Sequence, residues 1–170
     1  MTSTVLILLF PAAMAFAAAS DLVTMTIPNR LQLLVIAGFF LSAVLVGMDA
    51  PTIGLHVLAA FAVLAGSFAF FSFGWIGGGD GKLAAATALW FGFSQNLIDY
   101  LVMSAFYGGL LTIGLLIIRA QPIPLIIPSQ PWMTRLLDQQ TGIPYGIALA
   151  LAGLSVYASS PWMTLALALR

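Results

Sequence analysis

The chain has 170 residues, of which 62% are hydrophobic and only 6% are charged. Soluble globular domains carry about a quarter charged residues, so this composition excludes a soluble protein and indicates an integral membrane protein. Five basic and five acidic residues cancel to a net charge of zero, which argues against nucleic acid as a partner. The chain contains no cysteine, which excludes disulfides and thiolate metal sites.

Six apolar runs recur from end to end and leave no room for a separate soluble domain. They are Val5–Ala19, Leu31–Met48, Ile53–Phe73, Leu83–Phe93, Leu97–Ile118 and Ile143–Tyr157. We therefore expect residues 1–170 to form a single all-α domain with six transmembrane helices, surrounded by membrane lipid. No basic residue precedes the first run, which favours a retained helix over a cleaved signal peptide. A spanning helix needs about 17–25 residues, so the fourth run must begin near Asp80 and reach Ser94, or else form a re-entrant half-helix.

The distribution of basic residues favours six spans over the re-entrant alternative. With six spans, one side of the membrane carries four basic residues and the other carries only Arg170; the four are Arg30, Lys82, Arg119 and Arg135. The re-entrant alternative gives a weaker split of three to two. Because positive charge favours the cytoplasm, we expect the amino terminus outside and Asp21 and Asp80 both at the cytoplasmic face.

The longest connection, residues 119–142, contains four prolines that prevent a continuous helix; they are Pro122, Pro124, Pro128 and Pro131. Its apolar residues Leu125-Ile126-Ile127 and Trp132-Met133 suggest a segment that lies at the membrane interface. Near the end of the chain, Pro161 is expected to kink or end the last helix.

Two of the five acidic residues follow glycine-rich or helix-ending sequences at the same predicted membrane edge. A carboxylate at membrane depth is costly and is a functional candidate by default. Asp80 follows Gly77, Gly78 and Gly79, which we expect to allow positive φ and to leave the backbone open to an extended substrate strand. Asp21 closes the first apolar run.

Each aspartate also has a purely structural interpretation. Asp80 would cap a helix that starts beside it, after an ordinary glycine turn. Asp21 would end the first helix, before a stop at Ile27-Pro28-Asn29 in which Asn29 caps the second helix. Lys82 would either tune the charge of the aspartate pair or serve as a cytoplasmic anchor.

The pair on one face supports a more specific chemistry than either residue alone. Peptide hydrolysis by two carboxyl groups needs one ionised group to deprotonate a water and one protonated group to donate to the carbonyl oxygen. Two neighbouring carboxyls keep a shared proton because both cannot ionise cheaply. The residues thus favour an aspartyl protease that needs no metal or organic cofactor.

Three sequence elements, in order, resemble the type IV prepilin peptidases of the GxGD class of membrane aspartyl proteases. They are Ser20-Asp21 with Ile27-Pro28-Asn29, then Gly77-Gly78-Gly79-Asp80-Gly81-Lys82-Leu83, then Pro144-Tyr145-Gly146. The resemblance implies that Asp21 and Asp80 are catalytic. From their position beside Asp80, we expect Gly77, Gly78, Gly79 and Lys82 to contact the substrate.

The resemblance also implies the substrate and location: cleavage of a basic leader from prepilins or pseudopilins, at the cytoplasmic face of the bacterial inner membrane. The chain is most similar to the short form that serves Flp (tight-adherence) pili. Larger relatives carry an insert with zinc-binding cysteines linked to amino-terminal methylation, which this sequence lacks, so we expect no methyltransferase activity. Val23, Thr24 and Met25 stand where relatives commonly have basic residues, a departure that would weaken substrate steering.

Two other functions fit an intramembrane carboxylate pair. One is a small proton- or cation-coupled transporter or channel component, and the other is a non-catalytic assembly protein that kept the fold. Asp99 is the rival intramembrane carboxylate, but the six-span topology places it across the membrane from Asp80. His56, the only histidine, is expected near the outer interface and not in a catalytic role.

Overall fold

The computed structural model describes residues 2–121 and 130–169. This described part is all-helical and contains no strand, which confirms that the fold is all-α. The helices are α1 (Thr2–Thr24), α2 (Asn29–Leu45), α3 (Ala50–Ser72), α4 (Gly78–Phe91), α5 (Gln95–Ala120), α6 (Pro131–Leu137), α7 (Tyr145–Tyr157) and α8 (Pro161–Ala168).

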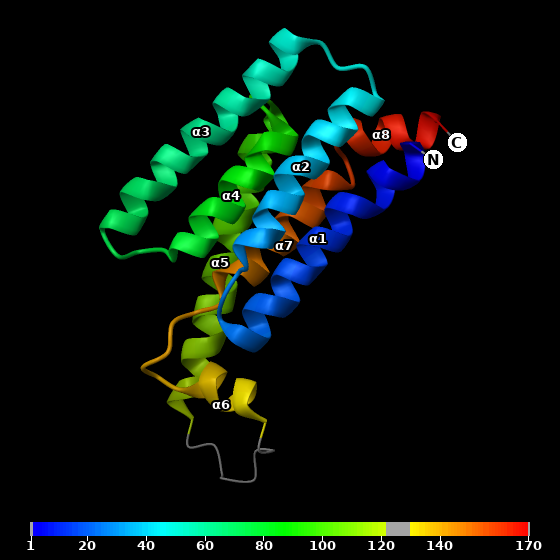
Figure 1. Cartoon of the computed structure of the whole chain (residues 1–170). Helices are drawn as coiled ribbons and strands as arrows, with labels where there is room; N and C mark the ends of the chain where they lie inside the picture. Colours follow the sequence, from blue (N-terminus) through cyan, green and yellow to red (C-terminus); the bar gives the residue numbers. More distant parts are fainter. Residues whose placement is uncertain (1, 122–129, 170) are drawn as a thin grey trace.

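The helices form one bundle, and α3 lies at its side (Figure 1). Helix α1 packs against α2, α7 and α8, and α5 lies along α7. Helix α4 contacts α2, α3, α5 and α7 and is therefore the shared neighbour within the bundle. Helix α3 packs mainly on α4 and leans away from α2, while α6 lies across the lower end of the bundle (Figure 1).

A cluster of aromatic residues joins the helices at the end of α4 that lies far from Asp80. The Phe10 ring stacks on Tyr157 with centroids 4.5 Å apart and lies 5.0 Å from Trp90. The Trp90 indole donates to the Val35 carbonyl at 3.0 Å, and the Trp162 indole donates to the Trp90 carbonyl at 2.6 Å. Because every indole N–H here has a partner, these large side chains can be buried without an unpaired donor.

The connection between α1 and α2 differs from the prediction in two details. Helix α1 continues past Asp21 to Thr24, so Asp21 lies inside the helix and not at its end. The chain leaves α1 at Met25, which has a φ of 55° and donates its N–H to the Asp21 carbonyl at 2.8 Å, as in a left-handed helix end. The N-cap of α2 is Pro28 and not Asn29; the expected capping role of Asn29 is therefore wrong.

The number of membrane spans is only partly settled by helix length. Three helices are long and apolar enough to cross a membrane: α1, α3 and α5. A fourth span is possible if α7 and α8, which meet at a bend of 49°, count as one broken span. Helix α2 has 17 residues and α4 has 14, so the six-span topology stays a prediction. The bend at Pro161 agrees with the expected kink, since Pro161 starts α8.

The predicted interfacial segment in the long connection is described only in part. Residues Leu125-Ile126-Ile127, with Pro122, Pro124 and Pro128, lie outside the described residues. Trp132 and Met133 belong to the short helix α6, which begins at Pro131. A proline fits there because the first residue of a helix has no intrahelical use for its N–H.

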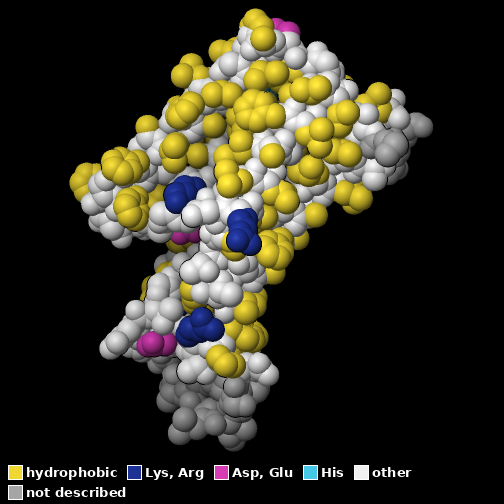
Figure 2. Space-filling view, in the orientation of Figure 1, with side chains coloured by type: hydrophobic (Ala, Val, Ile, Leu, Met, Phe, Trp, Pro, Cys, Tyr) yellow, Lys and Arg dark blue, Asp and Glu magenta, His cyan; other side chains and the backbone are white. Residues whose placement is uncertain are grey.

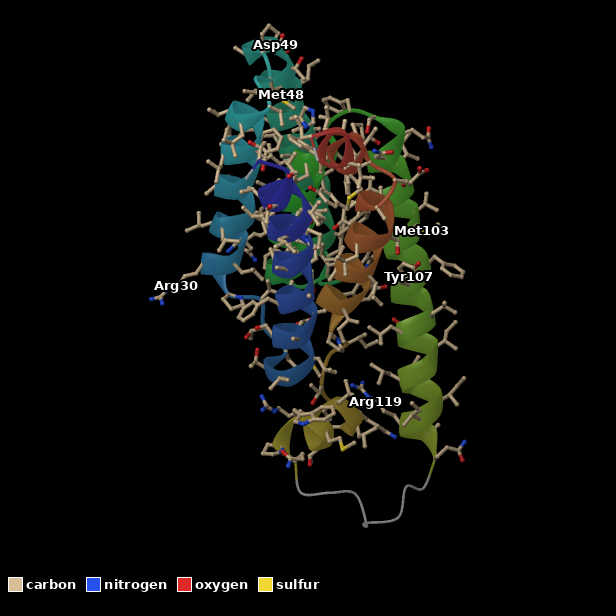
Figure 3. The ribbon with its side chains drawn as sticks, turned by 90° about the vertical axis from the view of Figure 1, so that its right-hand side faces the viewer. Arg30, Met48, Asp49, Met103, Tyr107 and Arg119 are labelled. Atoms are coloured by element: carbon tan, nitrogen blue, oxygen red, sulfur yellow. The ribbon has the colours of Figure 1, made fainter. Side chains whose placement is uncertain are left out.

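Basic residues gather at one end of the bundle (Figure 2). Arg30 lies at the start of α2 and points outward, whereas Arg119 lies at the end of α5 and points inward (Figure 3). Asp49 lies at the opposite end, in the turn before α3. Because basic residues favour the cytoplasmic side of a membrane, we expect this basic end to face the cytoplasm.

We predict that the basic end faces the cytoplasm. In the cysteine-free chain, Asp49→Cys should react with a membrane-impermeant thiol reagent added to intact cells, whereas Arg135→Cys should react only after the membrane is opened. Mass spectrometry or gel shift measures the labelling. External labelling of Arg135→Cys would contradict this orientation.

Candidate active site

A concave site with a volume of about 850 Å³ opens at the basic end of the bundle. Asp21 from α1 and Asp80 from α4 both line it. The rest of its wall comes from segments around the same end: residues 25–29, residues 74–79, Lys82, Arg119 and residues 141–145. The fold therefore brings the two predicted aspartates, 59 positions apart in the numbering, to one pocket.

The Asp21 carboxylate is held by the first turn of α7. Asp21 is only 4% exposed, and its Oδ2 accepts a hydrogen bond from the Gly146 backbone N–H at 2.7 Å. Gly146 is the second residue of α7, where backbone N–H groups have no intrahelical acceptor. The helix dipole adds a favourable interaction with a negative charge at this position. This hydrogen bond fixes one carboxylate oxygen of Asp21 and offsets part of the cost of burying the group.

Gly146 is needed for this close approach. A Cβ built at position 146 would lie 2.8 Å from Asp21 Oδ2 and 2.7 Å from Ile27 Cδ1. Both separations are too short for non-bonded atoms, so any side chain would displace the carboxylate or Ile27. The Pro144-Tyr145-Gly146 element thus has a structural explanation: Pro144 is the N-cap of α7, and Gly146 admits the carboxylate.

Asp80 occupies the third position of α4, and Gly77 is the N-cap of that helix. The Asp80 carboxylate lies against the Gly77 backbone, at the helix position from which an acidic side chain reaches the N-cap in a capping box. This position agrees with the structural interpretation of Asp80 as a helix-capping residue. It does not compete with a catalytic role, because the same carboxylate also lines the pocket and lies within the electrostatic field of Asp21.

The expected left-handed glycine bend is wrong in its location. The described glycines with positive φ are Gly47, Gly74 and Gly92. Gly77 has a φ of −74°, and Gly78 and Gly79 already belong to α4. The glycines before Asp80 matter for close approach instead: a Cβ at Gly77 would lie 2.8 Å from Asp80 Oδ2, whereas one at Gly79 would make only an ordinary contact, 3.6 Å from Ile27 Cβ.

Ile27 and Gln32 connect the two aspartate-bearing regions. The buried Ile27 side chain packs between Gly146 of α7 and Gly79 of α4. Gln32 of α2 donates from Nε2 to the Gly79 carbonyl at 3.1 Å and is itself 5% exposed. The α1–α2 connection therefore acts as a spacer that sets where the first turn of α4 lies relative to Asp21.

Lys82 is exposed and points along the pocket edge. Its Nζ donates to Asn29 Oδ1 at 3.2 Å, which ties the first turns of α4 and α2 together. Both residues line the pocket. This contact gives Asn29 a partner in place of the capping role expected for it.

Arg119 is a pocket residue that sequence reasoning treated only as a cytoplasmic charge. It is 9% exposed, and its guanidinium donates to three backbone carbonyls at 2.7–3.0 Å; they belong to Leu136, Thr141 and Gly142. In return, the Arg119 carbonyl accepts from Gln139 Nε2 at 3.1 Å. Arg119 thereby fixes the segment that leads into α7 (Figure 3). In the sequence, the one indication that Arg119 holds this segment is its position at the end of an apolar run, before a proline-rich connection.

Of the other residues considered from the sequence, His56 and Asp99 lie away from the pocket. His56 Nδ1 is 2.7 Å from the Leu89 carbonyl and its ring stacks on Phe39, so it is a packing residue. Asp99 is hydrogen-bonded to Gln95 beyond the far end of α4. Tyr145 does line the pocket. In residues 2–121 and 130–169, no group of three His, Cys, Asp or Glu side chains is arranged to hold a metal ion.

Comparison with known proteins identifies the family of the chain. Residues 8–117, which include both aspartates, match the model of the type IV leader peptidase family. No curated protein and no solved structure matched the chain. Since the family model covers well over half of the sequence, the chain belongs to the type IV leader peptidase family, a family of peptidases of the aspartic type.

We predict that Gly77→Ala and Gly146→Ala lower peptidase activity at least about tenfold while the protein still folds. In each variant the added methyl would lie 2.8 Å from a carboxylate oxygen, so the carboxylate has to shift. A tenfold loss of activity corresponds to about 1.4 kcal/mol of lost transition-state stabilisation. Kinetics with purified protein measure the effect. Gly66→Ala is the control because its Cβ would meet nothing within 4 Å; unchanged activity of both test variants would contradict the close-approach explanation.

We predict that Arg119→Met destabilises the protein by about 3 kcal/mol, because it leaves buried carbonyls without donors. The unfolding temperature in detergent should fall by about 6–12 °C for a chain of this size. Arg119→Lys should recover only part of the loss, since an ammonium cannot replace the planar guanidinium fork.

The matched control for Arg119 is Arg135→Met. Arg135 is exposed, and among the described residues its side chain hydrogen-bonds only to the Pro131 carbonyl within α6, so its replacement should leave the unfolding temperature nearly unchanged. Equal effects of the two substitutions would show that the buried contacts of Arg119 carry no special stability.

Proposed function

We propose that the protein is a membrane aspartyl endopeptidase that removes leader peptides from type IV prepilins, with Asp21 and Asp80 as its catalytic carboxyl groups. The observation that carries the proposal is that these two aspartates line one pocket at the same end of the bundle. Membership of the type IV leader peptidase family supports the reaction class.

The two carboxyls differ in a way that suits acid–base chemistry. Asp21 accepts a hydrogen bond from the N-terminus of α7, which favours its ionised form. Its charge then disfavours ionisation of Asp80. The pair holds one proton in common: the ionised carboxyl takes a proton from water as the water attacks the peptide carbonyl carbon, and the protonated carboxyl donates to the carbonyl oxygen.

The charge distribution indicates the side of the membrane, and the sequence resemblance indicates the substrate type. The pocket lies at the end where Arg30, Lys82, Arg119 and Arg135 gather, so we propose that cleavage occurs at the cytoplasmic face of the inner membrane. The resemblance to the short form of the family favours prepilins of the Flp type as substrates. We propose no metal or organic cofactor for this reaction, because two carboxyls and water suffice.

We predict that Asp21→Asn and Asp80→Asn each abolish leader cleavage, since neither remaining carboxyl can act as acid and base at once. Each variant should still insert into the membrane at the wild-type level. Co-expression with a candidate Flp-type prepilin, followed by mass spectrometry of the prepilin amino terminus, measures the result.

Asp99→Asn is the matched control, because this carboxylate lies beyond the far end of α4 and should leave processing intact. Near-normal cleavage by either pocket variant would rule out the two-carboxyl mechanism. Ion flux in proteoliposomes that is lost in Asp80→Asn, without any cleavage by the wild type, would support the transporter alternative.

A further inference from the structure

A second cavity, an apolar groove of about 510 Å³, lies between α2 and α3 with α4 as its floor. We call it the α2–α3 groove. It exists because α3 packs on α4 and leans away from α2 (Figure 1). Hydrophobic side chains cover this face of the molecule (Figure 2).

Each wall of the groove is a single helical stripe. Residues on one helix face recur at spacings of three and four, and each helix contributes such a set. The sets are Asn29, Gln32, Leu33, Ile36 and Phe40 from α2; Val57, Ala60, Phe61 and Leu64 from α3; Lys82, Ala85, Ala86 and Leu89 from α4. Three such stripes around one hollow are complementary in shape to a further helix.

The floor of the groove favours close approach of a helix. Ala85 and Ala86 of α4 and Ala60 of α3 have the smallest side chains in the lining, and small residues are what allow helix backbones to approach within a membrane. The α2 stripe from Asn29 to Phe40 is about 16 Å long at 1.5 Å per residue, which accommodates about eleven helical residues.

The groove is continuous with the pocket that holds the two aspartates. Asn29 and Lys82 line both cavities. Together with Gln32 they are the polar lining residues of the groove, and all three lie at its pocket end, in the first turns of α2 and α4. The floor stripe begins at Lys82, two residues after Asp80, so a chain that leaves the aspartates along α4 enters the groove.

We infer that the α2–α3 groove binds an apolar, uncharged helix of the substrate, directly next to the cleaved peptide bond. The inference rests on the proposed function. It adds that this helix of the substrate supplies binding affinity. The substrate is extended in the aspartate pocket and becomes helical where it passes Lys82 and Asn29.

A lipid chain is the other apolar occupant that a membrane supplies. A helix fits better because Ala85 and Ala86 in the floor and Ala60 in the α3 wall leave room for the backbone of a further helix.

The test measures the cleavage of two substrates by wild-type protein and by a variant whose groove is filled with a large side chain. One substrate is a prepilin-type precursor with an apolar segment of about ten residues beside its cleavage site, and the other is the same peptide without that segment. Ala60→Trp places a large ring in the groove, and Ala62→Trp is the control because Ala62 is exposed and points about 200° away around α3.

We expect Ala60→Trp to lower kcat/KM at least about tenfold for the full precursor and to change it less than about twofold for the shortened peptide. Ala62→Trp should alter neither. Wild-type cleavage of the full precursor by Ala60→Trp would overturn the proposal, and so would an equal loss on both substrates.

A cross-linking experiment covers the case in which Ala60→Trp does not fold. A photoreactive benzoylphenylalanine replaces Leu33, which lines the groove and is 65% exposed, or the neighbouring Leu34, which does not line it and is 50% exposed. In an Asp80→Asn background the full precursor should form an adduct at position 33 and not at position 34.

The outcomes separate the two proposals. Adducts with lipid alone at position 33, while wild-type protein cleaves the precursor, would overturn the groove inference and leave the peptidase intact. Absence of cleavage by the wild type, with a precursor adduct at position 33, would instead contradict the proposed function and keep the groove as a helix-binding site.

Discussion

The contact between the Asp21 carboxylate and the Gly146 amide places more constraints on this structure than any other pair of groups. A buried carboxylate is costly unless it is hydrogen-bonded, and here the donor is a free N–H in the first turn of α7. The contact requires a glycine at 146, and it requires α7 to start beside the end of α1. Helix α7 in turn starts where it does because Arg119 holds the preceding segment by its carbonyls.

The two aspartates have separate supports that meet at Ile27. Asp21 depends on α1, α7 and the Arg119 contacts, whereas Asp80 depends on the start of α4 and on Gln32 from α2. Ile27 touches a glycine on each side. A hydrophobic side chain, neither charged nor catalytic, thus sets the separation of two charged groups. This explains why a short connection between the first two helices forms part of the site.

Much of the site could be predicted from the sequence, because rare polar residues are conspicuous in a chain that is 62% hydrophobic. Asp21, Asp80 and the fold class followed from that contrast. The glycine geometry did not, since a run such as Gly77-Gly78-Gly79 fits a left-handed turn or a close approach equally well, and only the position of the Asp80 oxygen separates the two. Arg119 was missed because its partners are carbonyls, which every residue possesses and which leave no mark in the sequence.

The length of α4 has a consequence for the depth at which the chemistry takes place. Its 14 residues measure about 21 Å, whereas the hydrocarbon layer of a bilayer is about 30 Å thick. Its neighbour α3 has 23 residues, or about 35 Å, enough to reach both head-group layers. Because α4 is shorter than the hydrocarbon layer and lies alongside α3, at least one end of α4 lies below the lipid head groups. Under the proposed function, the pocket that opens at the Asp80 end is the route by which water reaches the two carboxyls and by which the cleaved leader leaves.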